Sequence, residues 1–507
     1  IVADEGSAKG ALIEFPAVDR VGSAEVSIWS GRKASLAEVA DSVARRLGPI
    51  ALPTPVVNAH WRPLETKGEL GAGKKPWVID TLTAPDDNPW KALLFFSGID
   101  FLPNGDLVAC TIHGDVWLVR GVDAQLAKLT WHRLATGLFQ PLGLRIVDGR
   151  IYVLGRDRIT VLRDLDGNGE ADVYENFSDL IETSAAGHDY VTCLETDVSG
   201  NFYYVDPRGV HRISSDGRSS ETIASGWRNP NGMSVGPDRT ITVAPQEGNW
   251  TPSSHIDVVR RDGYYGFGGP RITSERPLGY DLPLCWMPRS VDNSSGSQVW
   301  VKSDRWGIGR GALLNLSFGR CSLQLVLRET VDGQPQGGVV PLPGRFISGV
   351  MRGTFSPFDG QLYLAGAQGW QTAATHDGCI QRMRYTGGAV RLPVGLAARR
   401  HGLHIKFSTP LQKTTAEDPG SYNIEQWNYE YASRYGSKEF SLAHPGAVAR
   451  DPVEIKSAHL REDGCTVVLE VPSIRPVMQM HVEWNVTAVD GAPMRGELFN
   501  TIHHLGE

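Results

Sequence analysis

The chain has 507 residues and a formal net charge of −7, a length that predicts several domains or one large repeat domain with additions. The mildly acidic balance without a basic block argues against nucleic acid as the main partner, and no apolar run is long enough to span a bilayer. With 57 glycines and 31 prolines, the composition favours many short strands joined by turns. The six cysteines form no CxxC pair, which argues against a zinc ribbon or a covalently attached haem.

Residues 1–76 are polar and weakly patterned. Within them, the stretch SLAEVADSVARRLG (35–48) repeats Ala, Val and Leu at helical spacing, which predicts one helix. The piece GELGAGKKP (68–76) has the composition of a linker. We therefore expect residues 1–76 to form a short N-terminal arm that packs on another part of the protein.

A recurring pattern begins at residue 77: an apolar strand, a Gly/Asp turn, a second strand, a polar loop and a third strand. The turns Asn104-Gly105, Asp148-Gly149 and Asp359-Gly360 are hairpin signals between alternating strands. About six such units fill residues 77–390, which predicts an all-β fold built on a six-bladed β-propeller. The alternative is a β-sandwich, in which repeats of this length and self-similarity are not expected.

Residues 391–507 lack this pattern. They hold strands such as GLHIKFS (402–408) and CTVVLEVPS (465–473), with turns between them. We expect a separate immunoglobulin-like β-sandwich here, with an accessory or docking role.

The loops that follow the second strand of each unit are expected to meet near the central channel of a propeller. Six converging loops with polar and aromatic side chains would form a pocket for a small polar ligand. The alternative is that they are solvated turn residues. Aligning the units, with Trp250 added as a sugar-stacking wall, places the following residues in this pocket: His113, Arg156, Asp206, Gln246, Glu247, Trp250, Asp304, Arg305, Gln368 and Trp370.

The stretch DLDGNGEADVYE (164–175) matches the calcium-loop pattern D-x-[DN]-x-[DN]-G-x5-E. Oxygen ligands at alternating positions let one loop wrap a cation, and Gly169 permits the sharp turn. Because strands flank it, we expect a structural calcium clamp on a hairpin. The predicted ligands are Asp164, Asp166, Asn168, the backbone carbonyl of Glu170, Asp172 directly or through water, and Glu175.

The stretch IASGWRNPNGMSVGPDRTITVAPQEGNWTPSSHIDVVRRDGYYGF (223–267) resembles the soluble quinoprotein glucose/sorbosone dehydrogenases. These are six-bladed propellers that use pyrroloquinoline quinone (PQQ) and calcium. The resemblance extends more weakly over residues 90–390. Residues 280–507, with VDNSSGSQVW, GWQT and EQWNYEY, look closer to the dehydrogenase-type propellers of planctomycete and verrucomicrobial proteins, which are often fused to cytochrome c.

This resemblance implies roles for individual residues. Arg228 and Asn229 would contact the quinone, with Arg228 stabilising negative charge on the reacting carbonyl oxygen. His188 would be the general base, and Asp206 would orient it. The remaining cofactor-binding residues implied are Gln246, Gly248, Asn249 and Arg352.

Three functions stay open. The first is a PQQ- and calcium-dependent oxidation of a sugar hydroxyl, with electrons passed to an external acceptor such as a cytochrome c. The second is a glycoside hydrolase or lyase that acts on polysaccharide, with Glu247, Asp304 and His188 as acid/base groups and without a quinone. The third is a non-catalytic glycan-binding propeller. Calcium use favours a periplasmic or secreted location.

Overall fold

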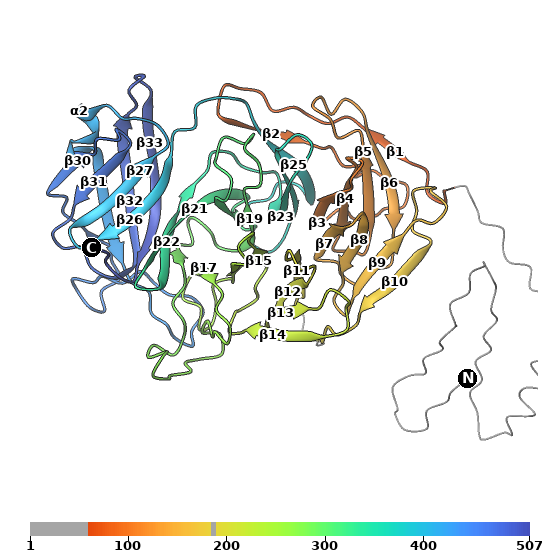
Figure 1. Cartoon of the computed structure of the whole chain (residues 1–507), viewed down its shortest axis with the longest axis horizontal. Coiled ribbons are helices and arrows are strands. Elements are labelled where there is room, and N and C mark those ends of the chain that lie inside the picture. The colour runs from red at the N-terminus through yellow and green to blue at the C-terminus, as the bar shows by residue number, and fades with distance from the viewer. Residues whose placement is uncertain (1–58, 184–188) are drawn as a thin grey trace, which may run out of the picture. The chain divides into compact units, whose positions relative to one another are not determined.

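We describe a computed structural model of the chain over residues 59–183 and 189–507, which belong to one compact unit that begins at Val57. The helix predicted at 35–48 lies outside these residues. The described part consists of antiparallel sheets with two short helical segments, α2 (Lys413–Ala416) and the 3-10 turn η1 (Pro419–Ser421). The prediction of an all-β fold is confirmed, and the arrangement is consistent with a β-propeller (Figure 1).

Three sheets follow one another from the N-terminal side of the described chain. Each is a meander in which neighbouring strands pair in sequence order. The first holds β3 (Phe96–Phe101), β4 (Leu107–Thr111), β5 (Val116–Arg120) and β6 (Leu129–Ala135), with β1 (Leu64–Thr66) added outside β6. The second holds β7 (Gly143–Val147), β8 (Arg150–Leu154), β9 (Ile159–Arg163) and β10 (Val173–Ser178). The third holds β11 (Thr192–Thr196), β12 (Phe202–Asp206), β13 (Gly209–Ile213) and β14 (Ser220–Ala224).

The next three sheets repeat the meander, and the last of them takes one strand from the start of the described chain. The fourth sheet holds β15 (Gly232–Val235), β16 (Ile241–Ala244), β17 (Ser254–Val258) and β18 (Cys285–Met287). The fifth begins with β19 (Ser295–Trp300), β20 (Leu313–Ser317), β21 (Ser322–Val331) and β22 (Gln334–Pro341). The sixth holds β23 (Gly349–Phe355), β24 (Leu362–Ala367), β25 (Gly378–Tyr385) and β2 (Trp77–Thr81).

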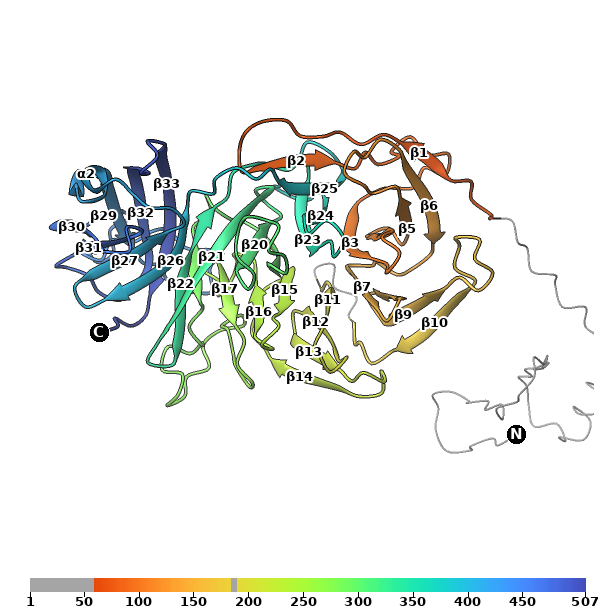
Figure 2. The ribbon, with the colours of Figure 1, turned by 45° about the horizontal axis from the view of Figure 1, so that its top comes forward.

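The first strands of these six sheets form a closed ring. Contacts run from β3 to β7, β11, β15, β19 and β23 in turn, and β23 contacts β3. Figure 2 shows β3, β7, β11, β15 and β23 around a common centre. In each of these sheets the first strand is the edge strand on the inner side of the ring.

The ring is closed by β2, which pairs with β25 about 300 residues later in the chain. Asp80 of β2 is fully buried and accepts hydrogen bonds from Nε of Arg382 (2.8 Å) and Nε of Arg384 (2.7 Å). Two arginines on one buried carboxylate compensate its desolvation. The closing strand is therefore fixed by charge as well as by the ladder of backbone hydrogen bonds.

The C-terminal region contains two sheets that share a core. One holds β26 (Pro393–Arg399), β27 (Gly402–Phe407), β31 (Thr466–Glu470) and β30 (Ser457–Leu460). The other holds β33 (Pro493–Ile502), β32 (Val477–Thr487), β28 (Tyr422–Trp427) and β29 (Asp451–Pro452). Phe407 and Trp484 meet edge to face across the core, with ring centroids 5.7 Å apart.

This second sheet continues the fifth sheet of the ring. β33 pairs with β22, and Gly338 lies opposite Asn500 (Figure 1). A Cβ at Gly338 would come within 3.0 Å of Asn500 Cα, so glycine permits the close approach of the two strands. One eight-stranded sheet therefore joins the C-terminal region to the ring.

Local sequence explains the hairpins. At Asp148-Gly149 both residues have positive φ (49° and 75°), and Val147 pairs with Arg150 across a two-residue loop, the geometry expected of this dipeptide. Each of the six cysteines is unpaired. No helix in residues 59–183 and 189–507 is both long and apolar enough to cross a bilayer.

Candidate functional site

Two kinds of loop lie at one end of the sheets, because antiparallel strands alternate direction. One kind joins the second and third strands of a sheet, and the other joins its fourth strand to the next sheet. Most of the predicted site residues lie in these loops: His113 after β4, Arg156 after β8, Asp206 at the end of β12, Arg228 and Asn229 between β14 and β15, Gln246, Glu247, Gly248, Asn249 and Trp250 between β16 and β17, and Gln368 and Trp370 after β24.

Arg228, Asn229, Gln246 and Glu247 are brought together by hydrogen bonds between the two loops that hold them. Nη1 of Arg228 donates to the backbone carbonyl of Glu247 (2.8 Å), and the backbone N–H of Gln246 donates to the carbonyl of Arg228 (3.2 Å). Nδ2 of Asn229 donates to Oε1 of Gln246 (3.3 Å). Asn229 has a φ of 47°, a conformation that asparagine tolerates better than most residues.

Gly248 lies directly beneath the Arg228 side chain. A Cβ added there would overlap Cδ and Nε of Arg228 and would lie 2.8 Å from Cζ. Glycine at this position therefore lets the guanidinium pack against the backbone of the loop. Among the described residues, Nη1 makes the one hydrogen bond of the Arg228 side chain, so Nε and Nη2 remain as donors for a ligand.

The Glu247 side chain is mostly buried, with 13% exposed. Oε1 accepts a hydrogen bond from Nη1 of Arg289 (3.1 Å), whose Nη2 donates to Oε1 of Gln371 (2.8 Å). Burial raises the pKa of Glu247, and the opposing charges of Arg289 and Arg228 limit the rise. A carboxyl with a raised pKa beside two arginines is a candidate for proton exchange with a ligand.

Arg289 and Gln371 were not predicted from the sequence. Arg289 lies in the connection to the fifth sheet, just as Arg228 lies in the connection to the fourth. Their shared position before the first strand of a sheet is the signal in the sequence that identifies Arg289. Most of the predicted residues follow second strands instead.

Asn249 and Trp250 contact a segment of the C-terminal region. Nδ2 of Asn249 donates to the carbonyl of Ser433 (2.6 Å), and the backbone N–H of Trp250 donates to the carbonyl of Ala432 (2.9 Å). The Trp250 ring lies 5.0 Å from the ring of Tyr431. In this structure both side chains serve the contact between the ring of sheets and the C-terminal region.

Arg352 is buried inside the ring. Its guanidinium donates to the backbone carbonyls of Leu142 (2.9 and 3.1 Å), Asn231 (2.8 Å) and Met351 (2.7 Å). These carbonyls belong to three different sheets or their connections, so Arg352 ties inner strands together. The expectation that it holds a cofactor carboxylate is corrected, since its donors are already used by the backbone.

Asp206 accepts hydrogen bonds from Nε2 of His211 (3.0 Å) and Nε of Arg208 (3.0 Å). Burial raises the pKa of its carboxyl, but the bonds from His211 and Arg208 outweigh this effect and leave the pKa below its ordinary value. The described histidine that Asp206 orients is therefore His211. His188, the predicted partner, lies outside the described residues.

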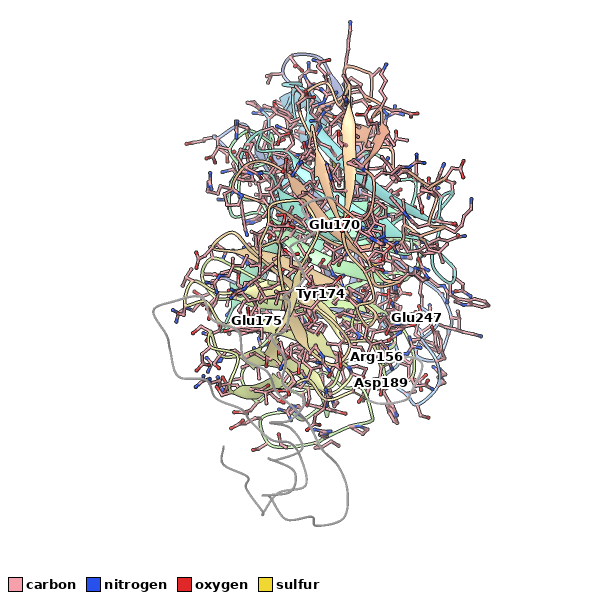
Figure 3. All side chains as sticks on the ribbon, turned by 90° about the vertical axis from the view of Figure 1, so that its right-hand side faces the viewer. Arg156, Glu170, Tyr174, Glu175, Asp189 and Glu247 are labelled. Carbon is pink, nitrogen blue, oxygen red and sulfur yellow. The ribbon has the colours of Figure 1, made fainter. Side chains whose placement is uncertain are left out.

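The surroundings of the other predicted pocket residues differ, and Trp370 directly precedes Gln371, the partner of Arg289. The ring of exposed His113 packs on Phe95 at 5.0 Å, and Arg156 donates to Thr183 Oγ1 (3.1 Å) and Gln140 Oε1 (3.3 Å). Trp370 is 89% exposed. Figure 3 marks Arg156, Asp189 and Glu247 on the sheet ring.

Asp304 and Arg305 require a correction. They lie between β19 and β20, the first and second strands of the fifth sheet, and the loop after its second strand is 318–321. Arg305 instead donates to the carbonyl of Phe358, between the first and second strands of the sixth sheet (2.9 Å). The two residues thus lie at the opposite end of the strands from Arg228, because a long loop separates the first two strands of this unit.

The calcium-loop residues lie between β9 and β10. Ligand atoms of Asp164, Asp166 and Asp172 lie within 4.8 Å of one another, as a metal site requires. Nδ2 of Asn168 donates to Asp166 (3.1 Å), and Oε1 of Glu170 accepts from the backbone N–H of Trp61 (2.5 Å).

Glu175 is not part of this cluster. It lies within β10, and Oε2 pairs with Nη2 of Arg163 (2.7 Å). The strand begins at Val173, so Asp172 is the last residue of the loop and the last of its three clustered carboxylates. The prediction that Glu175 binds the metal is corrected (Figure 3).

Comparison with known proteins gives matches among solved structures alone. No family model matches the chain, and no curated protein does. A glucose dehydrogenase-type oxidoreductase from Thermus thermophilus is 15% identical, with a TM-score of 0.47 over 61% of this chain and 99% of that one. The PQQ-bound aldose sugar dehydrogenase of Streptomyces coelicolor is 12% identical, with a TM-score of 0.43 over 63% and 99%.

A gluconolactonase from Xanthomonas campestris is 18% identical, with a TM-score of 0.38 over 66% of this chain and 99% of that one. The solved structures that this chain resembles thus include a glucose dehydrogenase-type oxidoreductase and a PQQ-bound aldose sugar dehydrogenase.

Proposed function

We propose that the loops carrying Arg228 and Glu247 form the active site of an oxidoreductase that oxidises a sugar hydroxyl. The observation that carries the proposal is the position of Arg228. Its guanidinium packs over Gly248, is held by the carbonyl of Glu247, and keeps two nitrogens for a ligand. A fixed guanidinium can stabilise negative charge that develops on an oxygen during transfer of a hydride equivalent.

The residues present fit PQQ at its quinone end and not at the position expected of Arg352. Arg228 would offer Nε and Nη2, and the amides of Asn229 and Gln246, which donate to Gln246 Oε1 and to Ser294 Oγ, would each offer their second N–H. Arg289, half-exposed beside Glu247, replaces Arg352 as the second cation of the proposed cofactor site. When bound, PQQ supplies a two-electron acceptor for the sugar hydroxyl. Arg228 would orient the carbonyl oxygen, and Glu247 would hold Arg289 in place.

The base that removes the hydroxyl proton is proposed to be His188, as the family resemblance implies. Asp206 is proposed to act on it indirectly, since its carboxylate already binds His211 and Arg208. Among the described residues, Glu247 is the alternative base, because burial raises the pKa of its carboxyl above the ordinary value.

The test reconstitutes the protein with PQQ and calcium and measures sugar-dependent dye reduction over a panel of aldoses and polyols. We expect turnover that falls about 10²–10³-fold in Arg228→Ala, the usual effect of removing a donor to a developing charge. Arg310→Ala is the matched control, because Arg310 is 61% exposed and pairs with Asp304 at the opposite end of the strands. Dye reduction by no sugar, or full turnover in Arg228→Ala, would contradict the proposal.

A second candidate function is cleavage of a glycan by acid/base chemistry, and the mostly buried Glu247 with its raised pKa favours it. Protein made without PQQ would then cleave polysaccharide, and Glu247→Gln would abolish the activity while Arg228→Ala would not. Binding of a glycan without turnover in either assay would instead indicate a non-catalytic binding protein.

We also propose that loop 164–172 binds calcium through Asp164, Asp166, Asn168 and Asp172, with the carbonyl of Glu170. The support is the spacing of these residues and the proximity of three carboxylates, which hard cations prefer. The ion would clamp the hairpin of β9 and β10.

A calcium-dependent protein of this kind is proposed to work in the periplasm or outside the cell and to pass electrons to a cytochrome c.

The domain division belongs to the same proposal. Residues 1–76 would form an arm, residues 77–390 a six-bladed propeller, and residues 391–507 an immunoglobulin-like β-sandwich. The closed ring of first strands and the two C-terminal sheets with a common core support this division.

A further inference from the structure

Residues 431–437 leave the C-terminal sheet between β28 and β29 and lie on the loop that holds Glu247, Gly248 and Trp250. Four hydrogen bonds join the two chain segments. The backbone N–H of Trp250 donates to Ala432 O (2.9 Å), Gly436 N–H to Gly248 O (3.0 Å), Ser437 N–H to Pro252 O (2.8 Å), and Nδ2 of Asn249 to Ser433 O (2.6 Å).

The same segment contacts two charged residues of the candidate site, Arg228 and Glu247. The ring of Tyr435 lies 5.0 Å from the guanidinium carbon of Arg228, a cation–π distance. Gly436 has a φ of 63°, and a Cβ there would come 2.5 Å from Oε1 of Glu247. The segment thus covers the carboxylate from one side and holds the guanidinium from another.

Two tyrosines of this segment differ in their surroundings. Tyr431 packs against Trp250 and Tyr280, and its hydroxyl donates to the carbonyl of Gly266 (2.6 Å). Burial raises its pKa. Tyr435 is 59% exposed, and its ring contact is with Arg228. Tyr431 therefore anchors the segment, whereas the exposed ring of Tyr435 contributes little to packing and faces the site.

We propose that residues 431–437 form a wall of the candidate active site and that Tyr435 is a positioning residue for Arg228. The inference rests on the proposed function, because it assigns the C-terminal region a part in the same site. An exposed aromatic face beside a cation is also the surface on which a sugar ring stacks, so the wall would contact the substrate as it enters.

The test compares Tyr435→Ala, Tyr435→Phe and the control Val448→Ala. Val448 lies on the same excursion between β28 and β29, is 57% exposed, and is far along the chain from the contact with Arg228. Tyr435→Ala should lower kcat/KM by about two- to five-fold, the effect of losing one exposed cation–π contact. Tyr435→Phe keeps the ring and should restore the wild-type value.

A double-mutant cycle measured by kcat/KM tests whether Tyr435 and Arg228 act together. In an Arg228→Lys background, which loses the planar guanidinium, Tyr435→Ala should have a smaller effect than in the wild type. Equal effects in both backgrounds would overturn the positioning role. The positioning role would also be overturned if the wild type is active and Tyr435→Ala has the same turnover.

Amide hydrogen exchange of residues 246–252 gives a readout that needs no activity. Tyr435→Ala frees the arginine that holds the Glu247 carbonyl, so exchange in this loop should rise, and it should not rise in Tyr435→Phe or Val448→Ala. Unchanged exchange in Tyr435→Ala would overturn the inference. If the wild type has no dehydrogenase activity but the variants show this exchange pattern, the proposed function is rejected. The contact of Tyr435 with the loop 246–252 would still be supported.

Discussion

Arg228 and Arg352 occupy two regions that the sequence suggested would serve the same cofactor. Arg352 lies inside the ring, 7% exposed, and its guanidinium donates to three backbone carbonyls. Arg228 lies half-buried between two loops, with one hydrogen bond to a carbonyl and a tyrosine ring beside it. The number of donors already in use therefore separates a structural arginine from one available for chemistry.

Arg352→Met gives the largest expected effect. It removes the charged donor from the carbonyls of Leu142 and Asn231, of which Leu142 keeps the backbone N–H of Cys193 (3.2 Å), and a hydrogen bond to a charged group contributes about 1.5–3 kcal/mol. We expect the free energy of unfolding in urea to fall by about 3 kcal/mol. The exposed pair of Arg310 with Asp304 makes Arg310→Met the control, with a change below about 0.5 kcal/mol. If Arg352→Met keeps its stability but no longer binds PQQ, Arg352 is a cofactor-binding residue.

Gly248→Ala should have the opposite effect to Arg352→Met, a loss of activity with little loss of stability. The added methyl displaces Arg228, which is a flexible side chain, so stability should change little while activity falls about 100-fold. Gly309→Ala is the matched control, because a Cβ there meets nothing within 4 Å. Kinetics and thermal melts of both variants check the prediction. A large loss of stability in Gly248→Ala would place this loop with the structural regions.

The calcium loop extends the comparison to exposed carboxylates. Saturating calcium at about 100 times Kd should stabilise the folded protein by about 2.7 kcal/mol. Asp166→Ala should remove this stabilisation, whereas Glu175→Gln should keep it because Glu175 pairs with Arg163. Thermal melts with calcium and with chelator measure both. If Glu175→Gln is no longer stabilised by calcium, Glu175 is a calcium ligand after all.

The pH dependence of Glu247 gives the smallest expected effect. Its pKa is raised in the folded state, so the folded protein binds this proton more tightly than the unfolded chain. The stabilising contribution of the protonated form is present below the unfolded pKa and is lost as pH rises through the folded pKa. Wild type should therefore become less stable relative to Glu247→Gln over that interval, as urea unfolding at several pH values would measure. The opposite slope would mean that the Arg289 pair dominates.

The sequence predicted what local patterns govern. Alternating apolar residues and the Asp148-Gly149 turn specify hairpins directly, and the RNPNG turn with its following loop brought Arg228, Asn229 and Gln246 together as expected. The 12-residue calcium pattern identified a loop in which three carboxylates do lie close together, but it could not show that β10 begins at Val173 and that Glu175 pairs with Arg163.

Pairings across long stretches of chain were beyond these patterns. The closure of β2 on β25 and the joining of β22 to β33 depend on strand edges that no local signal identifies. The long loop between β19 and β20 shifted the alignment, which misplaced Asp304 and Arg305. Tyr435 was missed because it comes from the C-terminal region, where the sequence indicated a separate module.

The most direct test of the central claim is a titration of the protein with PQQ in the presence of calcium, followed by quinone absorbance. We predict saturable binding that weakens at least about tenfold in Arg228→Ala and stays at the wild-type level in Arg310→Ala. Absence of saturable binding, or equal affinity of Arg228→Ala and wild type, would contradict the assignment of this site.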